Sequence, residues 1–207
     1  MYVPPLFAEE DAETVAAMID AARLGLLVTH GRQGLTATHL PFIHDRAGGR
    51  LVGHIARANP QWRDGAAEAL VVLGGPEAYV SPNWYPSKAV DGKQVPTWNY
   101  EAVHVTGAVE WFDDRDRLLD IVARLSDRHE AGREQPWSIG DAPAEYIERL
   151  LGGIVGVEVA IGRIEAKRKL SQNKPPADRR GVVEGLSASA DARDRLVADR
   201  MRSREEC

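Results

Sequence analysis

The stretch from His54 to Trp62, His-Ile-Ala-Arg-Ala-Asn-Pro-Gln-Trp, places a histidine and an arginine directly before a helix-start signal. Asn is favoured at a helix N-cap and Pro at the first helical position, so Asn59 and Pro60 predict a short helix that follows a strand. The N-terminus of such a helix offers free N–H groups to an anion, and Arg57 adds a permanently charged fork that suits a phosphate. The pattern indicates a phosphate pocket. An alternative stays open, in which Arg57 pairs with a surface carboxylate and Asn59-Pro60 only begins a helix.

A second stretch with the means to bind a ligand is Ser81-Pro-Asn-Trp-Tyr-Pro-Ser-Lys88, within a long loop predicted over residues 82–94. Long ordered loops tend to be functional. Its hydroxyls, its lysine and the flat faces of Trp84 and Tyr85 suit a phosphorylated aromatic ligand such as a flavin or a nucleotide. The alternative is that the aromatic residues fill a barrel core and that Lys88 is solvated.

The sequence contains no motif of an enzyme that works without a cofactor among those considered. The histidines have neither HExxH nor HxH spacing, and there is no Gly-x-Ser-x-Gly, Walker A or Gly-x-Gly-x-x-Gly sequence. The single cysteine is the last residue, Cys207, which excludes a disulfide framework and a cysteine-built metal site. No metal site is therefore expected, and difficult chemistry would fall to a bound cofactor.

The bulk composition is that of an ordinary globular protein. The chain has 207 residues, 28% of them charged and 43% hydrophobic, with a formal net charge of −5. An acidic chain is not drawn to nucleic acid or anionic lipid by its overall field. There is no signal-peptide pattern and no apolar run long enough for a membrane span, so a cytoplasmic protein without membrane contact is expected.

Hydrophobic periodicity predicts a mostly β or α+β chain. An amphipathic helix is expected over residues 11–23. Strands are expected over residues 26–29, 35–43, 50–57, 69–73, 77–81, 95–112 and 155–164, with Gly74-Gly-Pro76 as an interruption. Short turns between the early strands indicate an antiparallel meander, and Asp113 and Asp141 are predicted to cap two later helices, the second burying Tyr146, Ile147, Leu150 and Leu151. The pattern favours a small Greek-key-like barrel with peripheral helices.

The last part of the chain changes in composition. Basic residues cluster between positions 163 and 180. A short helix is expected over residues 177–186, and residues 187–207 form a polar segment predicted to be an exposed or frayed helix. We therefore expect a barrel domain over residues 1–170 and a basic, helical C-terminal tail over residues 171–207 that closes the site and is then exposed.

Nearly the whole chain resembles the PaiB family of FMN-binding negative transcriptional regulators. The matching segments run in order from Met1 to about Leu186: MYVPPLF, LVTHGRQGLTATHLPF, GHIARANPQW, AYVSPNWYPSK, VPTWNYEAVHVTG, DRHE and PW before DAPAEYI, IVGVEV, KRKLSQNK and PADRRGVVEGL. The resemblance implies a split β-barrel like that of the pyridoxamine-phosphate oxidases, with FMN bound at the interface of a homodimer. It also implies a regulatory role in sporulation and in the production of degradative enzymes.

The resemblance also implies roles for individual residues. Backbone groups along the isoalloxazine edge would come from Thr38, His39 and Leu40. The phosphate would be held by His54, Arg57 and Asn59, with Gln61 nearby. Residues lining the ring, in the same or the partner subunit, would be Ser81, Trp84, Tyr85, Lys88, Thr97, Trp98 and Asn99. The site would be closed by Lys169, Ser171 and Gln172. This chain departs from the family at Ala166-Lys-Arg-Lys169, where Gly-Lys-Trp-Lys is expected, and in a longer tail beyond Leu186.

Two other functions stay open. The protein could be an FMN-dependent oxidoreductase or oxidase, or it could be a split barrel that binds or degrades haem, with His39, His54 or His129 as the axial ligand. Direct DNA binding through residues 167–180 ranks below these, because the whole chain is acidic and has no helix-turn-helix pattern.

Overall fold

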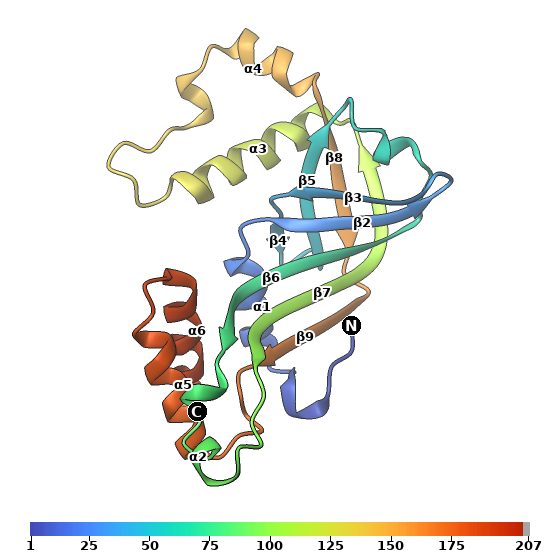
Figure 1. The fold of residues 1–207 in the computed structure, drawn as a ribbon. Coiled ribbons are helices and arrows are strands. Elements are labelled where there is room, and N and C mark those ends of the chain that lie inside the picture. The colour runs from blue at the N-terminus through green and yellow to red at the C-terminus, as the bar shows by residue number, and fades with distance from the viewer. Residues whose placement is uncertain (205–207) are drawn as a thin grey trace. The chain divides into compact units, whose positions relative to one another are not determined.

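The computed structural model describes residues 1–204, which form two compact units (Figure 1). The first unit contains Met1–Met18, Gly74–Val103 and the described part of Glu165–Cys207, and the second contains Ile19–Leu73 and His104–Ile164. Two long strands, β6 (Glu68–Val80) and β7 (Thr97–Phe112), and the helix α1 (Ala12–Ala21) contribute residues to both units. The predicted domain boundary at residue 170 stays a prediction.

The second unit is built on an antiparallel sheet. Its other strands are β2 (Gly25–Gly31), β3 (Gly34–Leu40), β4 (Ile43–Asp45), β5 (Arg50–Ala56) and β8 (Ile154–Ala160), in the spatial order β3-β2-β6-β7-β8-β5-β4. The predicted hairpin is confirmed, since β2 and β3 pair antiparallel with Gly31 opposite Gly34. Within residues 1–204, β3 pairs with β2 alone and so ends the sheet.

Helix α3 (Arg115–Glu130) packs on β4, β5 and β8. Leu118, Ile121 and Leu125 form a buried cluster with residues of the strands and with Leu151 of helix α4 (Ala144–Leu151). Three expectations are wrong here. The N-cap of α3 is Asp114, which accepts from the Arg117 N–H, and not Asp113. Asp141 ends a separate 3-10 helix, η4 (Ile139–Asp141), and the N-cap of α4 is Pro143. On α4, Leu151 is buried as predicted, but Tyr146 and Leu150 are 45% and 49% exposed, because they lie on the side of the helix that the cluster does not cover.

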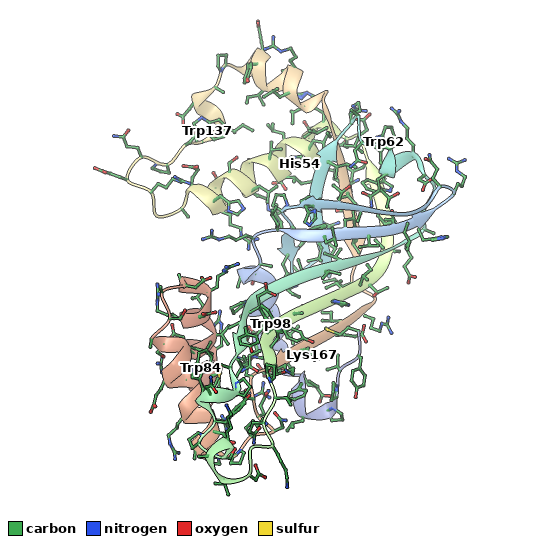
Figure 2. All side chains as sticks on the ribbon, viewed as in Figure 1. His54, Trp62, Trp84, Trp98, Trp137 and Lys167 are labelled. Carbon is green, nitrogen blue, oxygen red and sulfur yellow. The ribbon has the colours of Figure 1, made fainter. Side chains whose placement is uncertain are left out.

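Side chains alternate along β5, so His54 lies on the same face as Val52, a member of the cluster under α3. His54 is labelled in Figure 2. Its Nδ1 is buried, with no hydrogen-bond partner in the described part of the chain. Burial lowers the pKa of His54 below its ordinary value. Burial therefore favours the neutral form of the imidazole.

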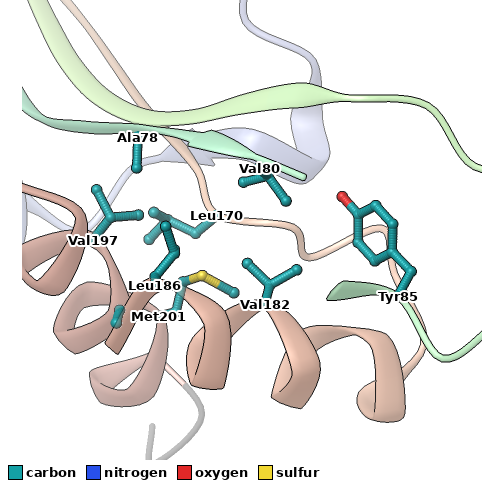
Figure 3. Packing of buried hydrophobic residues seen from close by; sticks show 9 residues of the cluster. Ala78, Val80, Tyr85, Leu170, Val182, Leu186, Val197 and Met201 are labelled. Carbon is teal, nitrogen blue, oxygen red and sulfur yellow. The ribbon is translucent and has the colours of Figure 1, made fainter. Parts of the chain in front are cut away.

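The first unit packs helices on one face of its strands. These helices are α5 (Pro176–Ser187) and α6 (Ala192–Ser203). The unit also contains η1 (Pro5–Phe7), β1 (Ala8–Glu9), η3 (Pro82–Trp84), α2 (Lys88–Asp91) and β9 (Arg163–Lys169) from residue 165 onward. The cluster in Figure 3 joins Val80 and Leu170 to Val182 and Leu186 of α5 and to Met201 of α6. Strands β8 and β9 replace the single strand that had been expected over residues 155–164.

The final helix differs from the expectation of an exposed or frayed segment. Val197, Ala198 and Met201 of α6 are essentially inaccessible to solvent. The few apolar residues of this polar helix are enough to pack it against the rest of the unit, because they lie on one stripe that α5 and the strands cover. Residues 205–207, which include Cys207, lie outside the described part of the chain.

Charged residues fasten α6 and β9 to the rest of the first unit. Arg168 Nε donates to Glu101 Oε1 at 2.7 Å, and its NH1 lies 3.3 Å from Glu9 Oε2. Arg200 of α6 forms an ion pair with Glu101 at 3.5 Å. Arg204, which directly follows α6, forms one with Glu9 at 3.5 Å. Glu101 is 5% exposed, so this network satisfies a buried carboxylate, and removing one partner would leave a buried charge unpaired.

The Gly74-Gly-Pro76 segment does not interrupt β6, which runs through it as one strand. The two glycines have different surroundings. A Cβ atom built on Gly75 would lie 2.8 Å from the Glu101 Cβ and 3.2 Å from the Glu101 carbonyl oxygen, whereas one built on Gly74 meets nothing within 4 Å. The close approach of β7 therefore requires a glycine at position 75 but not at position 74.

We expect Gly75→Ala to lower the free energy of unfolding by about 1–3 kcal/mol, because the added methyl group overpacks the strand that carries Glu101. Gly74→Ala is the matched control and should leave stability unchanged or raise it slightly, since alanine restricts the unfolded chain. Urea unfolding of the two variants checks this. Equal effects at both positions would show that the spacing of β6 and β7 is not what selects glycine.

The partly buried His54 predicts a dependence of stability on pH. The unfolded chain binds a proton at His54 more readily than the folded chain, because the folded pKa is lowered. The wild type should therefore lose stability relative to His54→Leu as the pH falls below about 6.5, until the folded pKa is passed. Denaturant unfolding of both proteins between pH 8 and pH 5 measures the difference. Parallel pH profiles would contradict the assignment.

Candidate functional site

The predicted ligand residues occur in both units, and each unit is described on its own. Thr38, His39, Leu40 and the residues between His54 and Gln61 belong to the second unit. The remaining predicted residues, from Ser81 to Asn99 and from Lys169 to Gln172, belong to the first.

The helix start at Asn59-Pro60 is confirmed as a short 3-10 helix, η2 (Pro60–Arg63). The Asn59 Oδ1 accepts from the Gln61 N–H at 3.0 Å, so the side chain of the chain itself occupies the N-terminus that had been expected to hold an anion. The Asn59 Nδ2 donates to Thr38 Oγ1 at 2.8 Å. The structure thus places Asn59 beside Thr38, and the two side chains bind each other directly.

Gln61 is buried beneath this turn. Its Nε2 donates to Thr29 Oγ1 at 3.0 Å and to the Leu27 carbonyl at 3.2 Å. These bonds fix η2 to strand β2. Gln61 thus ties the short helix to the sheet, and any contact of Gln61 with a ligand stays a prediction.

Arg57 forms a two-pronged pair with Asp113. Arg57 Nη1 donates to Asp113 Oδ2 at 2.8 Å, and Arg57 Nη2 donates to Asp113 Oδ1 at 2.5 Å. The carbonyls of Gly152 and Ile154 accept further bonds, at 2.7 and 2.9 Å. The pairing with Arg57 lowers the pKa of Asp113. Arg57 is thus paired with a carboxylate, which is the alternative to a phosphate pocket that the sequence left open. To bind Arg57, a phosphate would have to take the place of the Asp113 carboxylate.

Strand β3 offers the backbone edge that the predicted flavin contacts need. Because β3 pairs with β2 alone within residues 1–204, its outer N–H and C=O groups are not used in a strand ladder. Along this edge Thr38 is half-buried, His39 is exposed and Leu40 is buried. A planar ligand with ring nitrogens and carbonyls could bind there as a further strand would.

In the first unit, the loop after β6 is held tightly. Ser81 Oγ accepts from the Asn83 N–H and caps η3. The backbone N–H and the hydroxyl of Ser87 both donate to Asp178, a buried residue at the start of α5. A Cβ at Gly185 would lie 2.4 Å from the indole of Trp84, so the glycine lets the ring lie directly on α5.

Trp84, Tyr85 and Lys88 meet at a pocket of about 560 Å³. It is lined by Asn83, Trp84, Tyr85, Pro86, Lys88, Ala89, Gly181, Glu184 and Gly185. Tyr85 is 2% exposed, and its hydroxyl has no hydrogen-bond partner of good geometry in the described residues. Figure 3 shows this hydroxyl directed into the apolar cluster. Burial, and then the charge of Asp178, raise the pKa of Tyr85.

The start of β7 and the segment after β9 are brought together. Lys169 Nζ donates to Thr97 Oγ1 at 2.6 Å and also to the Trp98 carbonyl. The Asn99 Nδ2 donates to Ser171 Oγ at 2.9 Å, and both residues are buried. Ser171 has a left-handed backbone with φ of 63°, an unusual conformation for a residue other than glycine.

Gln172 closes this turn on itself. Its Oε1 accepts from the Leu170 N–H at 2.7 Å, and its Nε2 donates to the Arg168 carbonyl. The predicted residues Thr97, Asn99, Lys169 and Ser171 therefore form one connected group, and Gln172 shapes the turn that carries it.

The sequence-based reasoning missed several residues of these sites. Asp113 was assigned to a helix cap, and Asp178 and Lys174 were given no role. The spacing of Gly181 and Gly185 places both glycines on one face of a helix, and this pattern in the sequence could have predicted close packing against that face.

Within residues 1–204 there is no cluster of three or more His, Cys, Asp or Glu side chains that could hold a metal ion. None of the helices in that range has the length and apolar character that a bilayer crossing requires.

Comparison with known proteins places the chain among flavin-related proteins. Residues 1–163 match the model of the family described as "Putative FMN-binding domain". The chain is 32% identical over 205 residues to the "Protease synthase and sporulation protein PAI 2" of Bacillus subtilis, covering 97% of this chain and 96% of that protein.

Solved structures share the fold. The conserved hypothetical protein Rv2991 of Mycobacterium tuberculosis aligns with a TM-score of 0.60 at 13% identity, over 84% of this chain and 94% of that one. The flavocytochrome Anf3 of Azotobacter vinelandii aligns with a TM-score of 0.56 at 17% identity, over 78% and 69%. The predicted α+β split barrel with peripheral helices is confirmed.

The family model spans most of the chain, and the similarity to PAI 2 runs from end to end. These matches show that the chain belongs to the "Putative FMN-binding domain" family and is a PaiB-like protein.

Proposed function

We propose that this protein binds FMN as a homodimer and acts as a negative regulator of transcription through that flavin. The observation that carries the proposal is the family match over residues 1–163, which includes β3, β5 and β7. The similarity to PAI 2 supports a role of the same kind, because it covers nearly the full length of both proteins.

The residues present fit a flavin in part. The outer edge of β3 has backbone donors and acceptors available for the polar edge of an isoalloxazine ring. The Thr38 hydroxyl, which accepts from Asn59, keeps a proton that it can donate. Arg57 fits a phosphate only once Asp113 has left its guanidinium, since the guanidinium now donates to Asp113 and to the carbonyls of Gly152 and Ile154.

Bound FMN would supply one- and two-electron redox chemistry, which the side chains of this protein do not provide. The contribution of the chain would be binding and orientation. The edge of β3 would fix the ring through backbone bonds, Gln61 would keep η2 in place beneath it, and the two carbonyls would hold the Arg57 side chain ready for an anion.

Regulation through the flavin is favoured over direct contact with DNA. Several basic residues from the cluster between positions 163 and 180 are engaged within the protein. Arg168 is paired with Glu101, and Lys167 is buried. They do not form the exposed basic stripe that a phosphate backbone requires. The formal charge of −5 acts in the same direction.

The visible spectrum of the purified protein tests the proposal. We expect flavin absorbance after purification or after reconstitution with FMN, and sedimentation of the holoprotein as a dimer. A protein that stays colourless after reconstitution, with free FMN recovered on gel filtration, would rule out the flavin proposal. A yellow protein that sediments as a monomer would rule out the homodimer.

If the phosphate of FMN displaces Asp113 from Arg57, substitutions of these two residues should have opposite effects on the affinity for FMN. Arg57→Ala should weaken FMN binding about tenfold or more, because charge-assisted hydrogen bonds to the phosphate are lost. Asp113→Asn should tighten it, because the competing carboxylate charge is removed. Quenching of flavin fluorescence gives both dissociation constants.

Riboflavin, which lacks the phosphate, is the control ligand. Its affinity should be the same in the wild type and in both variants. If Arg57→Ala weakens riboflavin and FMN equally, Arg57 acts on the fold of the site, and its assignment to the phosphate is wrong.

A further inference from the structure

Strands β2 and β6 are apolar on both of their faces where they pair with each other in the second unit. Side chains alternate along a strand, and Leu27 and Val71, which lie opposite one another and are inaccessible to solvent, point into the core. The residues beside them, which point the other way, are also aliphatic: Leu26, Val28, Leu70 and Val72. An antiparallel sheet with one face in water usually alternates apolar and polar residues, whereas strands covered on both faces are apolar throughout. The composition of β2 and β6 is therefore that of strands covered on both sides.

Strand β3 continues this apolar surface to the edge of the sheet. Ala37 of β3 lies opposite Val28, and Val28 lies opposite Leu70, so the three side chains form one row across the three strands. Leu35 points to the same side as Ala37 and is 76% exposed. We call these aliphatic residues of the second unit the outer face: Leu26, Val28, Leu35, Ala37, Leu70 and Val72.

Elsewhere in the same sheet, a helix covers the side that faces away from the core. Val52 of β5 is buried in one cluster with Leu118 and Ile121 of α3. Figure 1 shows α3 beside β5 and β8, and in the described part of the second unit no helix lies over β2 and β3. Val28 and Leu70 are accordingly only half-buried, and Ala37 is exposed. The outer face is thus an apolar surface that the described chain leaves open to water, as is typical of an interaction site.

The outer face lacks the charges that a charged partner would need. The other residues that point to this side of β2, β3 and the part of β6 in the second unit are His30, His39 and Glu68. Glu68, the first residue of β6, is the one carboxylate among these described positions, and none of them is Lys or Arg. A two-fold axis places a surface patch against the same patch of a second copy, where like charges would repel one another. A patch without charge is therefore complementary to itself.

We propose that the outer face packs against the outer face of a second copy of this chain, so that the two sheets lie face to face. The inference rests on the homodimer of the proposed function, and it assigns the surface through which that homodimer forms. The aliphatic side chains would make the apolar centre of the interface, and Glu68 would lie at its polar rim. Removal of these side chains from water would drive the association.

Sedimentation equilibrium of the full chain as purified measures the dissociation constant of the dimer. Leu35→Lys should raise this constant about tenfold or more, because the two-fold axis brings two added charges into one apolar interface. Leu196→Lys is the matched control, since Leu196 of α6 is 54% exposed and lies in the first unit, outside the outer face. The control should have the dissociation constant of the wild type.

A pair of variants at Val28 tests whether the outer face packs on itself. Val28 lies on the middle strand of the three, so its two copies come close together when the face packs against itself. Val28→Lys and Val28→Glu should each be monomeric at concentrations where the wild type is a dimer. An equimolar mixture of the two should associate again, because the added charges are then opposite.

Circular dichroism of each variant establishes that it is folded, and the exposed Leu35 keeps the test available if a charge at Val28 prevents folding. A wild type that sediments as a monomer would overturn the inference. So would an equal loss of dimer in Leu196→Lys, or folded Val28 variants whose mixture stays monomeric. A dimer that Leu35→Lys leaves unchanged would also overturn it, while the homodimer of the proposed function would stand on another surface. A colourless dimer that Leu35→Lys dissociates would support the outer face and remove the flavin, so the two proposals can fail separately.

Discussion

The buried pairing of Arg168 with Glu101 is the constraint on which the first unit depends. Glu101 is nearly inaccessible, and an unpaired carboxylate there would be strongly destabilising. Arg168 satisfies it from β9, and Arg200 adds a second contact from α6. Because Glu9 shares the same arginine, β1, β7, β9 and α6 are joined by one network.

That pairing determines what lies on the opposite side of β9. With Arg168 turned toward Glu101, strand alternation places Lys167 and Lys169 on the other face, beside Tyr100 and Trp98. The turn that follows is equally constrained. Leu170 enters the apolar cluster and Ser171 adopts a left-handed backbone to reach Asn99. The closing segment is therefore shaped by the core.

Local signals in the sequence predicted much of the fold. The β2–β3 hairpin and the Asn59 cap were predicted from turn and capping residues. The helices found at Arg115–Glu130 and Pro176–Ser187 were predicted to within two residues, although the cap of the first was expected at Asp113. Predictions that needed tertiary information were wrong. Gly75 is not a break in β6, because its missing side chain admits Glu101. The burial of Met201 depends on surfaces of α5 and β6 that no local pattern in α6 describes.

The candidate site shows the same limit. The loop at Trp84 and the closing segment at Lys169 could be singled out from residue types and from the family resemblance. The partner of Arg57 could not, since Asp113 lies far away in sequence and reads as a helix cap.

The most direct test of the flavin site is a crystal structure of the protein grown with FMN and without other phosphate. We predict the phosphate of FMN within hydrogen-bonding distance of the Arg57 guanidinium, with the Asp113 carboxylate displaced from it. Bound FMN whose phosphate lies elsewhere, with Arg57 still paired to Asp113, would contradict the account.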